Sequence, residues 1–248
     1  MMRNFLYFLI ILGIFSSCSK SSGTFTDHRD GRKYKWIKIG NDKWMAENLA
    51  YLPQVNSVTE ASLDDAKYYI FDYEGHKTIE AKSFETLYWN DSTIIPYKYF
   101  GVLYNWEAIV GKHTNNKGRV QGVCPSGWHI PTDEEWKKLE LSLGMDSLEV
   151  DAIGLRNNNL LGFNLKADYG WNNSGNGTNA FGFAALPAGE AFSGVGFQEV
   201  GEKVTYWTAT EGLFKTTAWT RSVLCCEPGI LRIERDKIDG FALRCVKD

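Results

Sequence analysis

The segment CPSGWHIPTDEEW, Cys124 to Trp136, places a cysteine, a histidine and three acidic residues close together. Residues of these types can act as nucleophiles, general bases or metal ligands. The segment also has the S/T-x-x-E pattern of a capping box at Thr132 and Glu135, in which each side chain binds the other residue's backbone amide. The pattern predicts a helix that begins after Thr132, buries Trp136 and ends at Gly144. We therefore interpret the acidic residues as structural.

The other reactive residues form no recognisable catalytic or metal-binding pattern. The four histidines lack metal-ligand spacing, so we expect His129 to be a packed or solvated imidazole rather than a base. No phosphate-binding loop or nucleophile elbow occurs in the sequence. The net charge is -3 and no basic stripe is present, which argues against a nucleic-acid partner. The sequence predicts no catalytic residue and no metal site.

Residues 1–17 have the features of a secretion signal. Arg3 precedes an apolar run over residues 5–15, which is shorter than the ~20 residues that a membrane span needs. Ser16 and Ser17 directly before Cys18 resemble the lipobox of bacterial lipoproteins, which implies cleavage before Cys18 and acyl chains attached to it. We expect this lipid to bind the membrane and to hold the protein at the cell envelope, at the outer membrane or cell surface. An ordinary secretory signal with an incidental Cys18 is the alternative.

Export would place the remaining four cysteines in an oxidising compartment, where disulfides persist. Four cysteines allow three pairings. Cys225 and Cys226 are adjacent, and neighbouring Cα atoms lie ~3.8 Å apart, below the usual disulfide range. The bridge that we favour therefore joins Cys124 to Cys245. Cys225 and Cys226 are then free, strained together or paired elsewhere.

The 248 residues, of which 44% are hydrophobic, can bury one sizeable core. Residues 18–29 are small and polar, which predicts a flexible tether. We expect residues 30–248 to form a single domain in which residues 53–98 are an irregular insertion with a short strand near residues 67–71.

Periodicity predicts an α+β fold class, with two helices packed on twisted antiparallel sheets and joined by long loops. A hairpin is expected over residues 34–45, and a helix over residues 103–110 that stops at Gly111. The late segments 183–189, 204–210, 218–224, 230–235 and 240–246 read as an antiparallel meander.

Several motifs together resemble one family. In chain order they are KIGNDKWMAENLAYLP, GVLYNWEAIVG, GVCPSGWHIPTDEEWKKLE, GFNLKADYGW, FGFAALPAGE, YWTATE and GFALRCVKD. They resemble the Fibrobacter succinogenes major paralogous domain of Bacteroidetes lipoproteins, over residues 30–248. The resemblance implies a C-type lectin-like fold, with a distant similarity to formylglycine-generating sulfatase-modifying enzymes. It supports the Cys124–Cys245 pairing and implies no substrate.

The function that we expect is surface display of a non-enzymatic domain that binds a glycan or protein ligand. In lectin-like folds the C-terminal half carries the ligand face. The residues near turns that we expect to be exposed there, and to contact a ligand, are Phe214, Lys215, Arg221, Glu227 and Arg232. We expect Trp207 and Trp219 to lie in the core instead.

Two alternatives stay open. One is a thiol or copper oxidase similar to the formylglycine-generating enzymes, although adjacent cysteines in a strand would point to opposite faces. The other is a purely structural envelope protein. We expect no cofactor. Calcium would be the exception, since Trp89-Asn90-Asp91 and Glu227-Pro228-Gly229 resemble the WND and EPN motifs of calcium-dependent lectins, but their order is reversed and Gly229 removes a ligand.

Overall fold

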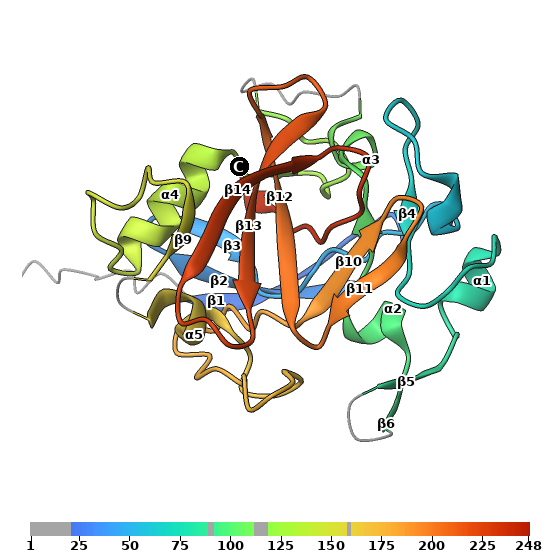
Figure 1. Cartoon of the computed structure of the whole chain (residues 1–248), viewed down its shortest axis with the longest axis horizontal. Helices are drawn as coiled ribbons and strands as arrows, with labels where there is room; N and C mark the ends of the chain where they lie inside the picture. Colours follow the sequence, from blue (N-terminus) through green and yellow to red (C-terminus); the bar gives the residue numbers. More distant parts are fainter. Residues whose placement is uncertain (1–20, 89–91, 112–118, 158–159) are drawn as a thin grey trace, which may run out of the picture.

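The computed structural model describes residues 21–88, 92–111, 119–157 and 160–248 (Figure 1). The fold is of the mixed α+β class, with most of its framework in β-sheets and only short helices, so the predicted fold class is confirmed at this level. In the view of Figure 1 the sheet of the C-terminal half lies in front and the first sheet lies behind it. No helix among the described residues is long and apolar enough to cross a bilayer.

The first sheet combines both ends of the domain. Its strand order is β1 (Ser22–Thr26), β2 (Lys33–Ile39), β3 (Asp42–Met45), β15 (Val246–Lys247) and β8 (Trp128–His129). The β2–β3 pair is the predicted hairpin, with Ile39 opposite Asp42 across the turn at Gly40. Val246 pairs with both Trp44 and His129, so the C-terminus joins the hairpin to the segment that precedes the longest helix.

The predicted flexible tether is wrong for residues 22–26, because they form β1 and pair antiparallel with β2. Phe25 stacks on Trp128 at 4.2 Å between ring centroids, which anchors the strand by an aromatic contact. Gly23 is needed for the pairing, since a Cβ there would lie 2.8 Å from the Trp36 ring. One aromatic residue among small polar ones is a weak signal, because its partner rings lie elsewhere in the sequence.

The second sheet has six strands. Their order is β11 (Gly196–Val200), β10 (Ala188–Phe192), β12 (Lys203–Glu211), β13 (Thr217–Leu224), β14 (Ile230–Asp236) and β9 (Gly154–Arg156). The consecutive antiparallel pairs β12–β13 and β13–β14 confirm the central part of the predicted meander. The prediction is wrong at both ends of the meander. β10 pairs parallel to β12, and the segment 240–246 does not continue from β14.

Residues 240–246 instead run between the two sheets as a buried segment. Phe241 bridges to Tyr104, and Ala242 bridges to Tyr206, before Val246 enters the first sheet. Every side chain from Phe241 to Val246 is buried, so both faces of the segment are covered. The segment is therefore an interior element, not the edge of a meander.

The helical elements are η1 (Val58–Glu60), α1 (Thr78–Ala81), α2 (Pro96–Tyr99), α3 (Trp106–Val110), α4 (Asp133–Ser142) and α5 (Leu161–Leu165). α4 has the predicted capping box, and Gly144 follows its end with a φ of 96°. α3 ends before Gly111 as predicted but begins three residues later than expected. Asn105 caps it by accepting from the Ala108 amide at 3.0 Å.

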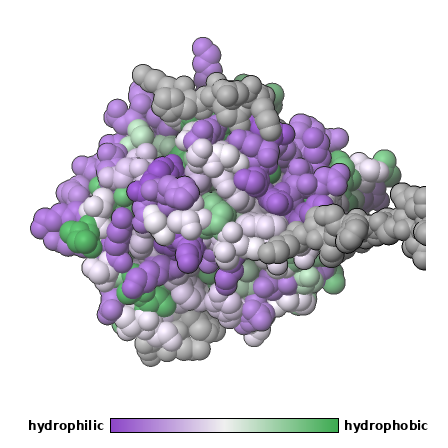
Figure 2. Space-filling view, turned by 180° about the vertical axis from the view of Figure 1, so that it is seen from behind, coloured by the Kyte–Doolittle hydropathy of each residue, from purple (hydrophilic) through white to green (hydrophobic). Residues whose placement is uncertain are grey.

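The 53–98 region is only partly a surface excursion. The small ribbon of β4 (Tyr68–Tyr69) and β7 (Leu103–Tyr104) confirms the predicted short strand, and a second ribbon joins β5 (Thr86–Tyr88) to β6 (Ser92–Ile94). Val55, Tyr69 and Ile70 are nevertheless buried. The face opposite to Figure 1 is mainly hydrophilic, with hydrophobic residues in small separate groups (Figure 2).

The predicted disulfide is confirmed. Cys124 and Cys245 are joined, with their Cα atoms 6.0 Å apart, and both are fully buried. The Cys245 carbonyl accepts from the Met45 amide at 3.0 Å. The bridge therefore links the approach to α4, the buried C-terminal segment and the first hairpin.

Replacing Cys124 and Cys245 together by serine should lower the free energy of unfolding by about 4–5 kcal/mol, because the bridge closes a loop with a sequence separation of 121. Urea denaturation of the two proteins measures the difference. Cys226→Ser is the matched control, since that thiol is free and exposed, and it should change stability by less than ~0.5 kcal/mol. A double variant as stable as the parent would contradict a stabilising role for the bridge.

Candidate functional site

The segment before α4 is a packed junction with no accessible reactive group. Thr132 Oγ1 accepts from the Glu135 amide at 3.1 Å, and Glu135 Oε2 accepts from the Thr132 amide at 2.9 Å. His129 is fully buried, with Nε2 2.8 Å from Glu135 and Nδ1 2.8 Å from Asp248. The expectation of a packed imidazole is confirmed, and the ring joins the start of α4 to the C-terminus.

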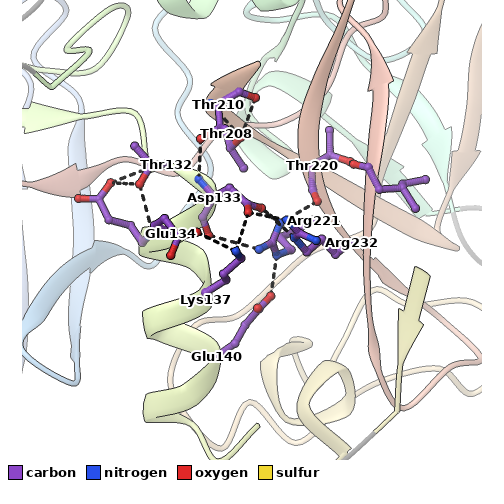
Figure 3. A network of polar contacts seen from close by, with 12 residues as sticks. Thr132, Asp133, Glu134, Lys137, Glu140, Thr208, Thr210, Thr220, Arg221 and Arg232 are labelled. Atoms are coloured by element: carbon purple, nitrogen blue, oxygen red, sulfur yellow. Dashed lines mark hydrogen bonds and ion pairs between the residues drawn. The ribbon is translucent and has the colours of Figure 1, made fainter. Parts of the chain in front are cut away.

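Arg221 and Arg232 were expected at the surface, and this expectation is wrong (Figure 3). Their side chains are 0% and 8% exposed and converge on the first turn of α4. Arg221 Nη1 lies 2.7 Å from Asp133 Oδ1, and Arg232 Nη2 lies 2.7 Å from Asp133 Oδ2. Arg221 also donates from Nε to Glu140 Oε1 at 2.7 Å. The cause is the register of the sheet, which places the two arginines directly opposite each other on the face that α4 covers.

The partners of Asp133 and Glu135 hold these two carboxylates ionised. Burial tends to raise the pKa of Asp133, but hydrogen bonds from Arg232 and the charge of Arg221 outweigh it and lower the pKa to about 2. Burial also tends to raise the pKa of Glu135, and the hydrogen bonds from His129 and Thr132 lower it to about 2. All these groups have partners within the protein, which identifies a structural cluster rather than a ligand site.

The other predicted contact residues lie apart. Phe214 is 70% exposed and Lys215 is exposed, both in the turn between β12 and β13, whereas Glu227 is half-buried in the turn between β13 and β14. These turns flank opposite ends of β13, so the structure does not bring the three residues together. Trp207 is buried as expected. Trp219 is only half-buried and lies beneath the Arg232 guanidinium, 3.9 Å from the ring centroid.

Cys225 and Cys226 lie in a turn rather than in a strand, so the two side chains do not point to opposite faces. Both thiols are free, and their Sγ atoms lie 2.7 Å apart. Burial and the neighbouring thiol raise the pKa of Cys225 to about 11. Lys166, which is buried, donates to the carbonyls of Leu224 and Cys225 at 3.1 and 2.6 Å. The lysine thus holds the backbone of the turn, and the Cys225 thiol is protonated at neutral pH.

A different part of the molecule contains an enclosed polar pocket of about 270 Å³. Three stretches far apart in sequence form its walls, namely residues 32–48, 98–101 and 169–186, and Arg244 closes it. The walls approach closely at Gly101, where a Cβ would lie 2.8 Å from the Leu49 carbonyl oxygen. Tyr99 and Tyr169 supply ring surface, with centroids 6.3 Å apart, and Tyr169 is 50% exposed.

Arg244 is held at the pocket by neutral acceptors. Its Nε donates to Asn48 Oδ1 at 3.0 Å, and its two terminal nitrogens donate to the carbonyls of Phe183 and Ala184. The guanidinium also lies 4.1 Å from the centroid of the Phe183 ring. Ala184 has a φ of 50°, an uncommon conformation for a residue with a side chain, and its amide is held by Asn179 Oδ1 at 2.8 Å. The loop is therefore organised around this side chain.

Sequence reasoning missed the pocket because its residues come from segments with no shared motif. The one local signal is Arg244 itself, a charged residue between the apolar residues of GFALRCV. A charged side chain buried at such a position needs hydrogen-bond or ion-pair partners, or binds a ligand. Tyr99, Tyr169 and the polar residues around them have no comparable signal.

Some predicted features lie outside the described residues, namely Cys18, Trp89-Asn90-Asp91 and His113. Within the described ranges, no three or more His, Cys, Asp or Glu residues are grouped so that they could hold a metal ion.

A sequence model described as the Fibrobacter succinogenes major domain matches residues 37–247. No curated protein and no solved structure was found to match.

Stability should fall as the pH drops from about 5 to about 2. The pKa of Asp133 is about 2 in the folded protein, below its ordinary value of 3.8, so its contribution is complete above the ordinary value and is lost as the pH falls through the folded one. The loss is on the order of 2 kcal/mol. Urea unfolding at a series of pH values measures it.

Asp133→Asn should lower the unfolding free energy by about 3–5 kcal/mol at neutral pH, because it leaves two buried arginines short of an acid, and should flatten the decline in acid. Glu134→Gln is the matched control one residue along, since Glu134 is 72% exposed and pairs with Lys137 at the surface. An acid profile of Asp133→Asn identical to that of the parent would show that this carboxylate does not control the decline.

Proposed function

We propose that this chain, which belongs to the Fibrobacter succinogenes major domain family, is a non-enzymatic binding module with a C-type lectin-like fold, displayed at the cell envelope. The ligand is a glycan or a protein, and the ligand site is the pocket bounded by residues 32–48, 98–101 and 169–186. The observation that carries the proposal is the organisation of this pocket around Arg244, whose hydrogen-bond partners are all neutral.

The chemistry of the pocket supports recognition rather than catalysis. Ligand sites combine an apolar surface with a few fixed polar groups, and here Tyr169 supplies an accessible ring while Asn48 and Arg244 supply fixed polar atoms. The Asn48 amide is oriented by its donation to the Phe100 carbonyl at 2.9 Å. Among the described residues no histidine lines the pocket, and the one acidic residue in its lining is Glu47.

Placement at the envelope is supported by the N-terminal sequence and by the disulfide. The apolar run over residues 5–15 and the small residues before Cys18 resemble a lipoprotein signal. A lipid on Cys18 would bind the protein to the outer membrane or cell surface. The buried disulfide fits folding outside the cytoplasm, where such bonds persist.

A second candidate function is a thiol or copper oxidase at Cys225 and Cys226. The observation in its favour is that both Sγ atoms lie on one side of a turn, beside a hollow that Lys166 and Phe163 help to line. The raised pKa of Cys225 opposes it, because the nucleophilic and metal-binding form of cysteine is the thiolate. Titration with Cu(I) distinguishes the two, since an oxidase would bind it tightly and Cys225→Ser would abolish the binding.

Binding should depend on the pocket. The full chain is applied to a glycan array and used to capture proteins from envelope extracts. Tyr169→Ala should weaken binding of the ligand about threefold to tenfold, because the exposed ring loses its stacking contact. Phe214→Ala, at a more exposed aromatic residue in the β12–β13 turn, should have no effect. A ligand lost on Phe214→Ala and retained on Tyr169→Ala would refute the pocket as the site.

Lipid attachment is tested separately. Cys18→Ser should abolish incorporation of a fatty-acid label and release the protein from membranes into the soluble fraction of producing cells. Cys226→Ser, which leaves the lipobox intact, is the control. Label retained by Cys18→Ser would exclude this residue as the acylation site.

A further inference from the structure

The buried cations of the chain fall into two groups. Seven lysine and arginine residues are buried in the described part, and five of them pair with a carboxylate, namely Arg156, Arg221, Arg232, Lys203 and Lys237. Arg244 and Lys166 are in none of the ion pairs among the described residues. Burying a charge without an opposite charge is unfavourable, so these two positions need an explanation.

The burial of Lys166 is explained by contacts within the protein. Its ammonium holds two backbone carbonyls of the Cys225 turn, so its role is to fix that turn. Arg244 differs, because a guanidinium has five N–H groups and its hydrogen bonds to Asn48, Phe183 and Ala184 use three of them. It lines a pocket while only 1% of it is exposed, so solvent screens its charge little.

The other cationic residues that line the pocket have the same positive charge as the buried Arg244. Arg32, Lys35 and Lys98 line the pocket with Arg244, and Glu47 is the only carboxylate that the described part of the chain adds to the lining. None of the three rim cations is in an ion pair with another described residue. The chain as a whole has a net charge of -3, so a cationic pocket is a local feature and not a reflection of composition. Walls of low dielectric strengthen the field inside such a pocket.

We infer that the pocket binds a saccharide residue that carries an anionic group, a carboxylate or a sulfate, drawn in by Arg244 and the rim lysines. This inference rests on the proposed function and adds the chemical class of the ligand. Guanidinium and ammonium groups form their strongest hydrogen bonds with such anions. The charge of Glu47 acts on Arg244 but forms no ion pair with it among the described residues, and a bound anion would supply that direct partner.

A saccharide fits the shape of the pocket better than an acidic peptide. The volume of about 270 Å³ lies near the lower end of the ~300–1,000 Å³ range of ligand pockets, which suits one or two small rings. Peptides usually bind along a sheet edge or a groove instead. Tyr169 and Tyr99 offer ring faces for stacking, and Asn48 and Asn179 offer amides in reach of hydroxyl groups.

The test compares ligands that differ only in charge. Calorimetry of the full chain measures the affinity for a galacturonic acid trimer, for its neutral methyl ester and for a sulfated galactose trimer. We expect at least one of the two anionic trimers to bind tenfold or more tightly than its neutral counterpart, the methyl ester or the unsulfated galactose trimer, with an affinity that falls as salt is added. The anionic trimer that binds identifies the group as carboxylate or sulfate.

Variants at exposed positions locate the site, because substitutions there leave the folded structure intact. The double variant Lys35→Gln and Lys98→Gln should lower the affinity for the anionic trimer about tenfold. Its affinity for the neutral counterpart should stay unchanged. Lys33→Gln, on the same strand as Lys35 but outside the pocket, should change neither.

The outcomes separate the two proposals. If anionic and neutral trimers bound with equal affinity and Tyr169→Ala abolished the binding of both, the inference of an anionic ligand would be refuted. The proposal of a binding module would still hold. No binding of either anionic trimer, or tighter binding of a poly-glutamate peptide that the lysine double variant abolishes, would also refute the inference of an anionic ligand. Absence of any ligand that depends on Tyr169, in the array and in the extracts, would refute the proposed function itself.

Discussion

A buried group of opposite charges holds the longest helix against the C-terminal sheet. Asp133 and Glu140 of α4 pair with three arginines from neighbouring strands, namely Arg221, Arg232 and Arg156. Each of these charges would be strongly unfavourable alone in the interior. Because Asp133 is the first residue of α4, the cap at Thr132 fixes where its carboxylate points. The register of the helix and the register of the sheet therefore constrain each other, and both constrain the loops that the sheets carry.

Sequence reasoning succeeded where the determinants are local and failed where they are not. The capping box at Thr132 and the turns between β12, β13 and β14 are encoded within a few residues, and all were predicted. The burial of Arg221 was not, because its partner Asp133 is 88 residues away and the surrounding TRS reads as a solvent-facing stretch. β1 was missed for a similar reason, since Phe25 finds its aromatic partners at Tyr34 and Trp128.

The disulfide and the pocket depend on the same buried segment. Cys245 is covalently fixed to Cys124, and the preceding residue is Arg244. The backbone that carries the pocket's arginine is thus held by a covalent bond on one side and by the pairing of Val246 with Trp44 and His129 on the other. Such support reduces the conformational freedom that a ligand would otherwise have to remove on binding. It also explains how walls from three distant stretches can meet at one side chain.

The early start of β1 limits how far the domain can stand from a lipid bilayer. If Cys18 carries the lipid, only four residue steps separate it from Ser22, the first residue of the strand. A fully extended chain of that length reaches about 14 Å, whereas a tether that ran to residue 29 would reach about 40 Å. The domain would then stay beside the headgroups with little freedom to turn. The domain could then bind a long polymer only where part of that polymer reached the membrane surface.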